Sequence, residues 1–401
     1  MPSNYVMFKS KILISFLVIL AIGCSDQICV AQSTLQNQPG INSDLHLLID
    51  QIATKKIIGL GESTHGSKEF SEIRSMMVKT LVSQYGYKAF VLEAEYIPCV
   101  KINEYILTGK GDPKQLLFGV RFWPWIHQDF LHLLIWMKDY NQFNPSKPVQ
   151  FFGMDSQYAK INATKKIIFE KFPDHAQNIF DITEGTEKRN HKIKLLRKLS
   201  EKKIDVTETQ QREWQYFIFC QIHILSQLSP VLYNSRDENM AGMVEIIHKS
   251  LGNDAKMILW THNGHINKNG PSLNNRTGMG FHLCRSYPGD FVAIGMDFKE
   301  GSFTAVDYDN KNERRPIAFF LKPFETTLAS VTDFGNDEIK WMDCKSIPAF
   351  TINSIGAIYV HNPKKGDAYY LESKSNKSFD YLILIKNSSP INLLQKDEDD
   401  Q

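Results

Sequence analysis

Two short segments of the sequence place histidines directly after apolar runs, which is a pattern that suits acid–base chemistry. The first, KIIGLGESTHGSKEF (residues 56–70), carries Glu62 and His65. The second, KMILWTHNGHI (residues 256–266), carries two histidines three positions apart. Histidine has an unperturbed pKa of about 6.5, so its ring can take a proton from water near neutral pH. We therefore expect the two loops to form one polar, hydrolytic site.

His65 is the candidate general base of this site. Glu62 lies three residues earlier in the same turn and is expected to hold one ring nitrogen, so that the other faces water. His262 and His265 are candidates for stabilising the developing oxyanion or placing the ester. The sequence leaves open which of these two histidines acts.

Two arginines fall on the apolar faces of expected helices. Arg74 lies within the apolar stripe of a helix predicted over 67–84, and Arg236 begins a helix that leads into the second histidine segment. A guanidinium on an apolar face needs an acid or a polar pocket. The alternative is a snorkelling side chain at the edge of the stripe. We assign both arginines to the site, where they would stabilise negative charge.

Carboxylates end two of the expected strands. Glu93 and Glu95 follow one apolar run with a single residue between them, and Asp155 ends another. Glu93 is a candidate ligand of the arginines, although a structural ion pair would explain it as well. Asp155 is assigned to substrate binding, with an N-cap or a sheet-edge salt bridge as the alternative.

Aromatic side chains offer an apolar wall for a bulky substrate. Trp123 and Trp125 flank Pro124, and we assign both tryptophans to substrate binding, with burial as the equal alternative. Core packing is the expected role of Trp136.

Apolar runs of strand length recur along the chain and are mostly separated by helical patterns. This alternation predicts an α/β fold with a largely parallel central sheet flanked by helices. Gly301 is expected to mark a tight turn between two antiparallel strands. A helical insertion over about 156–252 is predicted to form part of a deep active-site cleft, either over the carboxyl edge of the sheet or as a layer on its face. The expected strands are 57–60, 89–93, 149–154, 257–261, 291–296, 302–306, 357–360 and 381–385.

The N-terminal residues predict export. Basic residues precede an apolar run too short to span a bilayer, which is typical of a signal peptide over 1–31. One interpretation is a lipoprotein signal cleaved before Cys24, in the sequence AIGC, and the other is ordinary cleavage near Ala31. We expect a periplasmic protein or an outer-membrane lipoprotein of a bacterium. A linker over 32–50, a hydrolase domain over 51–390 and an acidic tail over 391–401 would follow.

The amino-acid composition argues only against partners that bind through a strong electrostatic field. The 46 basic and 44 acidic residues leave a net charge of +2, which favours neither nucleic acid nor acidic lipid. Past the signal segment, four cysteines remain without metal-like spacing. Free thiols are expected, and one disulfide is the alternative in an oxidising compartment. These cysteines are Cys99, Cys220, Cys284 and Cys344.

Seven ordered motifs resemble the erythromycin esterase family, from about residue 56 to beyond residue 303. The resemblance implies an α/β hydrolytic fold around a deep cleft, no metal and no other cofactor, and a histidine that activates water to open a macrolide lactone. On this sequence that histidine is His65, and the matching positions that line the site include Glu93. The motifs are GLGESTHG, FVLEAEY, FWPWIHQDFLHLLIWMKDYN, FFGMD, SRDENMAGMV, WTHNGHI and MGFHLCRSYPGDFVAIGMDFKEGSF.

Three other mechanisms or functions compete with this prediction. A serine nucleophile is disfavoured because the chain has no GxSxG motif. A metal hydrolase is the sharper rival, since the histidines and glutamates supply enough nitrogen and oxygen ligands for zinc, although two nearby arginines would repel a dication. The third is an exported protein that binds a ligand without catalysis. The prediction is thus a metal-independent esterase whose substrate class within the esters is open.

Overall fold

The computed structural model describes residues 43–156, 161–227, 236–269, 271–272, 276–308, 315–322, 326–359, 370–373 and 377–396. The chain divides into two compact units, residues 1–43 and 44–401, and the described residues belong to the second unit apart from Ser43. The predicted signal segment with Cys24 lies outside the described residues, as does most of the predicted linker. No helix in the described part of the chain is long and apolar enough to cross a membrane.

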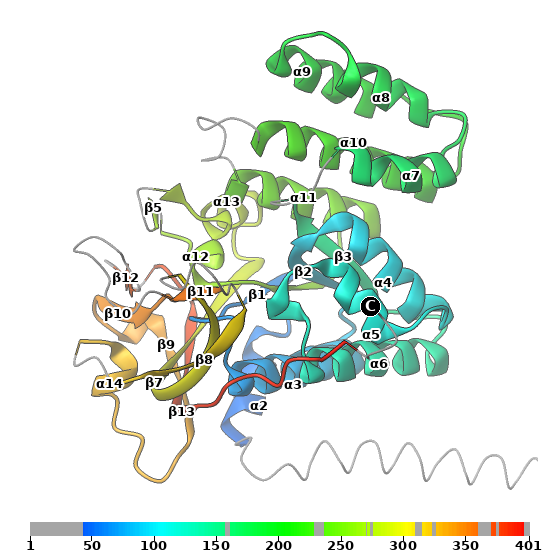
Figure 1. Cartoon of the computed structure of the whole chain (residues 1–401). Coiled ribbons are helices and arrows are strands. Elements are labelled where there is room, and N and C mark those ends of the chain that lie inside the picture. Colours follow the sequence, from blue (N-terminus) through cyan, green and yellow to red (C-terminus); the bar gives the residue numbers. More distant parts are fainter. Residues whose placement is uncertain are drawn as a thin grey trace, which may run out of the picture. The chain divides into compact units, whose positions relative to one another are not determined.

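The second unit is built on a nine-stranded mixed sheet with the order β3-β2-β4-β1-β7-β13-β9, and β8 and β11 also pair with β7 (Figure 1). The strands from β3 to β13 are parallel, while β9 and β8 are antiparallel to their neighbours. The predicted α/β class with a largely parallel sheet is therefore confirmed. The strands of this sheet are β1 (Ile57–Leu60), β2 (Ala89–Glu95), β3 (Gln150–Asp155), β4 (Met257–Trp260), β7 (Phe291–Asp307), β8 (Pro316–Leu321), β9 (Ile339–Asp343), β11 (Ile358–Tyr359) and β13 (Tyr381–Ser388).

The strand order explains why polar loops meet at one edge. β1 lies between β4 and β7, with Leu60 opposite Trp260 on one side and Ile294 on the other. All four residues of β1 and of β4 are buried, as expected for strands covered on both faces. The chain segments that follow β1 and β4 therefore leave the sheet side by side.

The predicted turn at Gly301 is wrong. β7 continues through it as one strand of 17 residues, and the antiparallel partner is β8, whose Leu321 faces Gly301. Gly301 has φ of +123°, and a Cβ there would lie 2.3 Å from the carbonyl oxygen of Ser388 on β13. Glycine is thus required at this position for two reasons. The backbones of β7 and β13 approach each other closely there, and only glycine adopts this φ without strain.

Helices cover both faces of the sheet. Figure 1 shows α3 and α6 on one side and α11 and α13 on the other, with α10 and α7, then α8 and α9, stacked outward from α11. The predicted helical region between β3 and β4 thus forms a layered stack whose last helix, α11, lies on the sheet. The helices are α2 (Ser43–Ile52), α3 (Lys68–Tyr85), α4 (Tyr96–Thr108), α5 (Pro113–Val120), α6 (Gln128–Phe143), α7 (Ile161–Lys171), α8 (Ala176–Glu184), α9 (Arg189–Ser200), α10 (Glu208–Gln227), α11 (Arg236–Leu251), α12 (Asn263–Ile266), α13 (Met279–Ser286) and α14 (Leu328–Val331).

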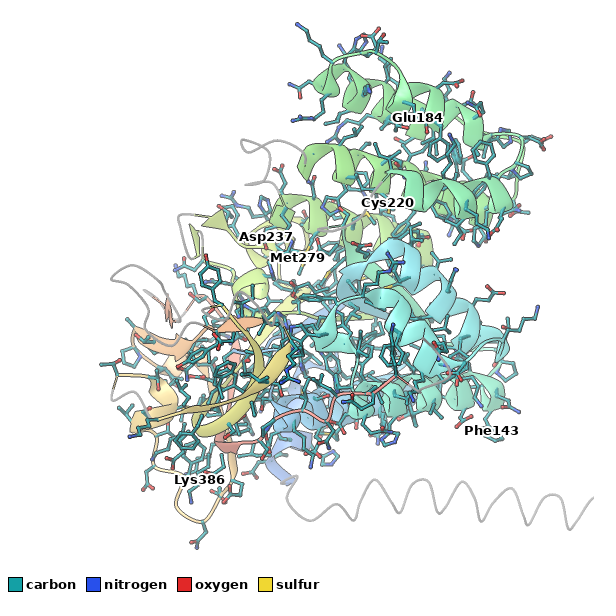
Figure 2. All side chains as sticks on the ribbon, in the orientation of Figure 1. Phe143, Glu184, Cys220, Asp237, Met279 and Lys386 are labelled. Atoms are coloured by element: carbon teal, nitrogen blue, oxygen red, sulfur yellow. The ribbon has the colours of Figure 1, made fainter. Side chains whose placement is uncertain are left out.

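Smaller elements complete this unit. The labelled side chains of Figure 2 mark the outward Phe143 at the end of α6, which is 67% exposed, and Cys220 on α10. Cys99, Cys220, Cys284 and Cys344 are all free thiols. The remaining elements are two short two-stranded sheets, β10 (Phe350–Asn353) with β12 (Tyr370–Ser373) and β5 (Pro271–Ser272) with β6 (Arg276–Thr277), and the 3₁₀ helices Trp123–Trp125 and Cys344–Ser346.

Helix α3 begins at Lys68 and ends at Tyr85, close to the predicted 67–84. Gly86 caps its C-terminus with φ of +71°, and its N–H bonds the carbonyl of Leu81, as expected for a left-handed cap. Arg74 is 2% exposed within this helix. It therefore lies on the buried face, where its charge needs a partner.

A C-terminal segment, residues 388–394, joins the loop after β1 to the start of α6. The carbonyl of Ser389 accepts from the N–H of Lys68, and the N–H of Ile391 donates to the carbonyl of Gly66. Farther along, the N–H of Gln128 donates to the carbonyl of Asn392. The segment thus connects two parts of the chain that the sequence pattern alone does not relate.

Removing residues 389–401 is expected to lower the free energy of unfolding by about 3 kcal/mol or more, since each lost backbone hydrogen bond is worth roughly 0.5–1.5 kcal/mol. Urea denaturation measures the loss. Removing only 397–401 is the control and should leave stability unchanged. Equal stability of the two truncated chains would contradict the expectation.

Candidate active site

A buried ion pair and a histidine occupy the loop after β1. Glu62 is fully buried, and its Oε1 lies 2.7 Å from Nδ1 of His65. Its other carboxylate oxygen accepts a hydrogen bond from Arg74, whose guanidinium also stacks over the ring of Trp260 at 3.9 Å. Burial opposes ionisation of Glu62, yet the charge of Arg74 and the hydrogen bond from His65 hold its pKa below the usual value. In the neutral ring, a carboxylate that accepts from Nδ1 leaves the proton off Nε2, the tautomer a general base needs.

The ring of His65 is enclosed by other rings. Phe122 and Trp125 meet it edge to face, with centroids at 6.1 and 5.5 Å, and the ring of His262 lies 5.4 Å away. His65 is only 7% exposed. Nε2 of His65 forms no hydrogen bond within the described part of the chain, so its lone pair is free for a water or a substrate proton.

His262 is held by backbone groups. Its Nδ1 accepts from the N–H of Gly264, and its Nε2 lies 3.2 Å from the carbonyl of Ser63. The ring must therefore carry its proton on Nε2 in order to donate to that carbonyl. Burial and the neighbouring His65 lower the pKa of His262 to about 4. His262 is neutral near pH 7 and fixes the loop that carries His65.

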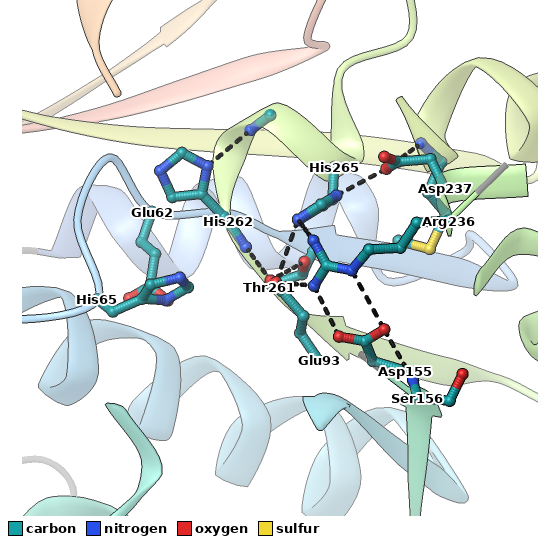
Figure 3. Close-up of polar contacts among 12 residues, drawn as sticks. Glu62, His65, Glu93, Asp155, Ser156, Arg236, Asp237, Thr261, His262 and His265 are labelled. Carbon is teal, nitrogen blue, oxygen red and sulfur yellow. Dashed lines mark hydrogen bonds and ion pairs between the residues drawn. The ribbon is translucent and has the colours of Figure 1, made fainter. Parts of the chain in front are cut away.

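Beside these rings, Arg236 bridges two carboxylates (Figure 3). Its Nε and one terminal nitrogen bond both oxygens of Asp155 at 3.2 and 2.6 Å, and that terminal nitrogen also bonds Glu93 at 2.9 Å. Burial opposes ionisation of both carboxyls. Even so, His265 and Arg236 hold the pKa of Glu93 well below its usual value, and Arg236 lowers that of Asp155.

Glu93 also fixes the loop after β4. Its Oε2 accepts from the hydroxyl of Thr261 at 2.6 Å and from the N–H of His262 at 2.9 Å. The neighbouring Glu95 is half-buried and lies beyond a register shift in β2, where α4 begins. Glu93 therefore ties the end of β2 to the loop that follows the parallel strand β4.

His265 lies between two carboxylates. Its Nδ1 is 2.7 Å from Asp237, and its Nε2 is 3.1 Å from Glu93. Burial opposes its charge, but Asp237 and Glu93 raise the pKa of His265 to about 10. The ring is thus an imidazolium near pH 7. The 3.1 Å approach of Arg236 to Nε2 is then a contact between two donors and not a hydrogen bond.

The protonated state of His265 predicts a pH dependence of stability. The folded-state pKa of about 10 lies above the unfolded value of about 6.5. The stabilisation is therefore fully present below about pH 6.5 and is lost as the pH rises toward 10. Urea denaturation of the wild type and of His265→Gln should give a stability difference that shrinks over this window. A difference constant with pH would contradict the assignment, and His46→Gln on the exposed face of α2 is the control.

The structure brings the predicted catalytic residues into two adjoining groups. Of the residues predicted to bind substrate, Asp155 has both carboxylate oxygens bonded to Arg236. Trp125 is 1% exposed, and its Nε1 donates to the carbonyl of Glu93 at 3.0 Å. The indole N–H thus stabilises the end of β2, while the indole ring packs against His65. Trp123 is half-buried. Trp136, expected in the core, is half-buried and stacks on Tyr140.

Sequence reasoning missed Asp237 and Thr261. Asp237 accepts from His265 and, at 2.9 Å, from the N–H of Met279, the first residue of α13; Figure 2 shows Asp237 and Met279 close together. The available signal was position, because Asp237 follows Arg236 directly and Thr261 precedes His262. Neither residue carries a pattern of its own.

The nitrogen and oxygen atoms of the site that could ligate a metal already bond cations or backbone groups. Within the described residues, no three His, Cys, Asp or Glu side chains are placed to hold a metal ion. Glu62 is bonded to Arg74, and Glu93 to Arg236. A hollow of about 740 Å³ lies between α9, α10, α11 and α13, lined among others by Arg197, Lys249 and Arg285. It contains none of the predicted site residues, so the deep cleft over His65 stays a prediction.

Comparison with known proteins relates the chain to one group. A family model described as erythromycin esterase matches residues 82–388. Among curated proteins, the Bacillus subtilis (strain 168) protein YbfO, whose name provisionally assigns it to the hydrolases, is 23% identical over 404 residues and covers 87% of each chain. Erythromycin esterase type II of Escherichia coli is 22% identical over 413 residues, covering 88% of this chain and 94% of its own.

Solved structures share the fold. A Bacillus cereus protein has a TM-score of 0.71 at 22% identity, covering 88% of this chain and 93% of its own. A mutant erythromycin esterase in its open conformation has a TM-score of 0.62 at 16% identity, covering 90% and 98%. At these identities the likeness concerns the arrangement of helices and strands.

Proposed function

Because the chain belongs to the erythromycin esterase family, we propose that it hydrolyses a carboxylic ester or a macrolactone with water activated by His65. The observation that carries the proposal is the buried Glu62–His65 pair. Glu62 lies 2.7 Å from Nδ1, while Nε2 has no hydrogen-bond partner in the described part of the chain. An oriented imidazole with one free nitrogen is the group that this reaction needs.

The proposed reaction has two proton transfers. Nε2 of His65 takes a proton from water as the water oxygen forms a bond to the ester carbon, which gives a tetrahedral oxyanion. The carbon–oxygen bond of the ester then breaks, and the proton on Nε2 passes to the departing alkoxide. Glu62 stays ionised throughout and stabilises the transient imidazolium.

The oxyanion needs positive charge, and two cations of the site retain some exposure. The side chain of Arg236 is 15% exposed and that of His265 is 16% exposed. We assign charge stabilisation and ester placement to this pair, whereas Arg74 is 2% exposed and acts through Glu62. His262 and His265 thereby divide their roles. The neutral His262 supports the loop that carries His65, and the charged His265 stabilises the oxyanion together with Arg236.

The rival metal mechanism has a specific difficulty. A metal would require Glu62 and Glu93 to give up bonds to Arg74 and Arg236, and buried carboxylates release such partners at a large cost. The family resemblance also implies no metal. A binding protein without catalysis would keep the same pocket residues, and a turnover measurement separates it from an esterase.

Mass spectrometry of small esters and macrolactones tests the proposal. The purified protein is incubated with p-nitrophenyl butyrate, erythromycin and larger-ring macrolides, with and without chelator. A gain of one water on any of these compounds, unchanged by chelator, supports the proposal. Loss of turnover with chelator, restored by zinc, would favour the metal mechanism. Binding of a macrolide without turnover would favour the ligand-binding alternative.

We also propose that the protein is exported and attached to a membrane by lipid on Cys24. The AIGC sequence at the end of the N-terminal apolar run supports this. Fractionation of cells that express the wild type or Cys24→Ser tests it. The wild type should partition with membranes and the variant should not, and identical partitioning would contradict lipid attachment.

A further inference from the structure

A third buried carboxyl lies behind the loop that carries His65. Asp297 belongs to β7 and is fully buried, three positions beyond Ile294, which pairs with Leu60 at the end of β1. It therefore stands beside the point where β1 becomes the Glu62–His65 loop. It belongs to neither group of the site described above.

Asp297 grips one residue with both carboxylate oxygens. Its Oδ2 accepts from the N–H of Asn353 at 3.1 Å, and its Oδ1 accepts from the side-chain amide of Asn353 at 2.9 Å. The same amide donates to the carbonyl of Phe298, and the N–H of Phe298 donates to Oδ1. Asn353, the last residue of β10, is thus locked to β7 by three hydrogen bonds.

The residues that follow Asn353 hold the loop of His65. The N–H of Ile355 donates to the carbonyl of Ser63 at 2.6 Å, and the N–H of His65 donates to the carbonyl of Gly356 at 3.4 Å. Thr64 and Gly356 form an isolated parallel bridge. Hydrogen bonds therefore fix Asn353 to Asp297 at one end of a short backbone segment and fix Ile355 and Gly356 to the residues on either side of Thr64 at the other end.

Burial governs the charge of Asp297. It raises the pKa of Asp297 to about 7, although hydrogen bonds from Asn353 and Phe298 oppose the rise. No cation pairs with Asp297 among the described residues. Burying a carboxyl without a counter-charge is unfavourable for folding unless hydrogen bonds compensate, and Asn353 and Phe298 supply those bonds here.

We propose that Asp297 is a positioning residue of the reaction, which holds the Asn353–Gly356 backbone and thereby fixes Glu62 and His65 in the geometry for water activation. The inference rests on the proposed function. It adds a support to the loop from Asn353–Gly356, a segment about 290 residues away from His65 in sequence. A displacement of about 1 Å at His65 would be enough to reduce turnover strongly.

The test compares Asp297→Asn with Asn353→Ala, which removes the same contact from its other side. In Asp297→Asn, one amide N–H₂ faces the N–H of Asn353, so a hydrogen bond is lost. In Asn353→Ala, the side-chain amide that donates to Asp297 and to the carbonyl of Phe298 is removed. Asp380→Asn is the matched control, because Asp380 also accepts from the backbone of β7, at the N–H of Ala293, and pairs with Lys268 away from the loop.

Two readouts are measured on the full chain. Turnover of p-nitrophenyl butyrate should fall by about tenfold or more in kcat in both Asp297→Asn and Asn353→Ala, with KM within about twofold. Hydrogen exchange of the peptides covering 60–68 and 350–357 should accelerate in both variants. The Asp380→Asn control should change neither.

An unchanged kcat in Asp297→Asn, or unchanged exchange of the loop peptides, would overturn the proposal. An unchanged kcat in Asn353→Ala would also overturn it, since the contact itself would then not matter. If the wild type hydrolyses none of the compounds offered, the proposed function fails. Exchange of the two peptides then decides by itself whether Asp297 holds the loop.

Discussion

Replacing His65 with alanine is expected to lower kcat/KM for ester hydrolysis by about three orders of magnitude, because general base catalysis by a positioned side chain contributes roughly 10²–10⁴-fold. The fold should survive. Glu62 keeps its bond to Arg74, so the substitution leaves no unpaired carboxylate, and the lost ring makes room between Phe122 and Trp125. Initial rates with p-nitrophenyl butyrate and a thermal melt of each protein measure the two effects.

A second histidine serves as the control for this result. His46 lies exposed on α2, far from the loop in sequence, and His46→Ala should retain wild-type rates. Hydrolysis by His65→Ala at a rate near that of the wild type would remove His65 as the base. Added imidazole that restores part of the lost rate would further support a proton-transfer role.

Replacing Arg236 with methionine is expected to lower the free energy of unfolding by about 3–5 kcal/mol, the range for removing one partner from a buried ion pair. Methionine has a similar length but leaves Asp155 without a cation and Glu93 with only the imidazolium of His265. Urea denaturation near neutral pH measures the loss. Arg285→Met is the control, since Arg285 is exposed and only stacks on Phe281. Its loss should cost about 1 kcal/mol or less.

A compensating variant sharpens the interpretation of this result. Adding Asp155→Asn to Arg236→Met removes the carboxylate charge that has lost its cation, so much of the stability should return even though the ion pair is gone. If this double variant is less stable than Arg236→Met, the carboxylate at position 155 is not destabilised by the missing cation. The charge argument for the site would then be wrong.

The division of the site into two groups explains how the site can hold both the proposed base and a source of positive charge. Arg74 neutralises Glu62 beneath His65, while Arg236 and His265 form a separate, partly exposed cationic pair held by three carboxylates. The two groups meet at Glu93, which bonds Arg236 and also the N–H of His262. A substitution in either group is therefore expected to alter the geometry of the other group through the loop after β4.

Local patterns predicted the parts of the site that depend on local geometry. The apolar run Ile57–Leu60, followed by Gly61 and Glu62, predicted β1 with its bounds, and the helical period placed Arg74 on the buried face of α3. Glu62 and His65 meet because they are three residues apart in one turn. In each case the cause lies within a few residues.

Long-range contacts explain what the sequence could not predict. Gly301 looks like a turn residue, but the reason for the glycine is the backbone of Ser388 on β13. Asp237 joins the site only because α11, α12 and α13 converge on it. The C-terminal residues 388–394 carry no motif, yet they join Gly66 to Gln128. Such contacts are set by sheet order and helix packing, and a single sequence does not encode them visibly.

The measurement that tests the central claim most directly is a single turnover in H₂¹⁸O with excess chelator, followed by mass spectrometry of the product and of the intact protein. Erythromycin or p-nitrophenyl butyrate is the substrate, whichever turns over faster. Direct attack by water on the ester, with His65 as base, predicts one ¹⁸O atom in the product acid and a protein of unchanged mass at every time. A protein that carries the acyl group during the turnover, or no turnover with chelator present, would contradict it.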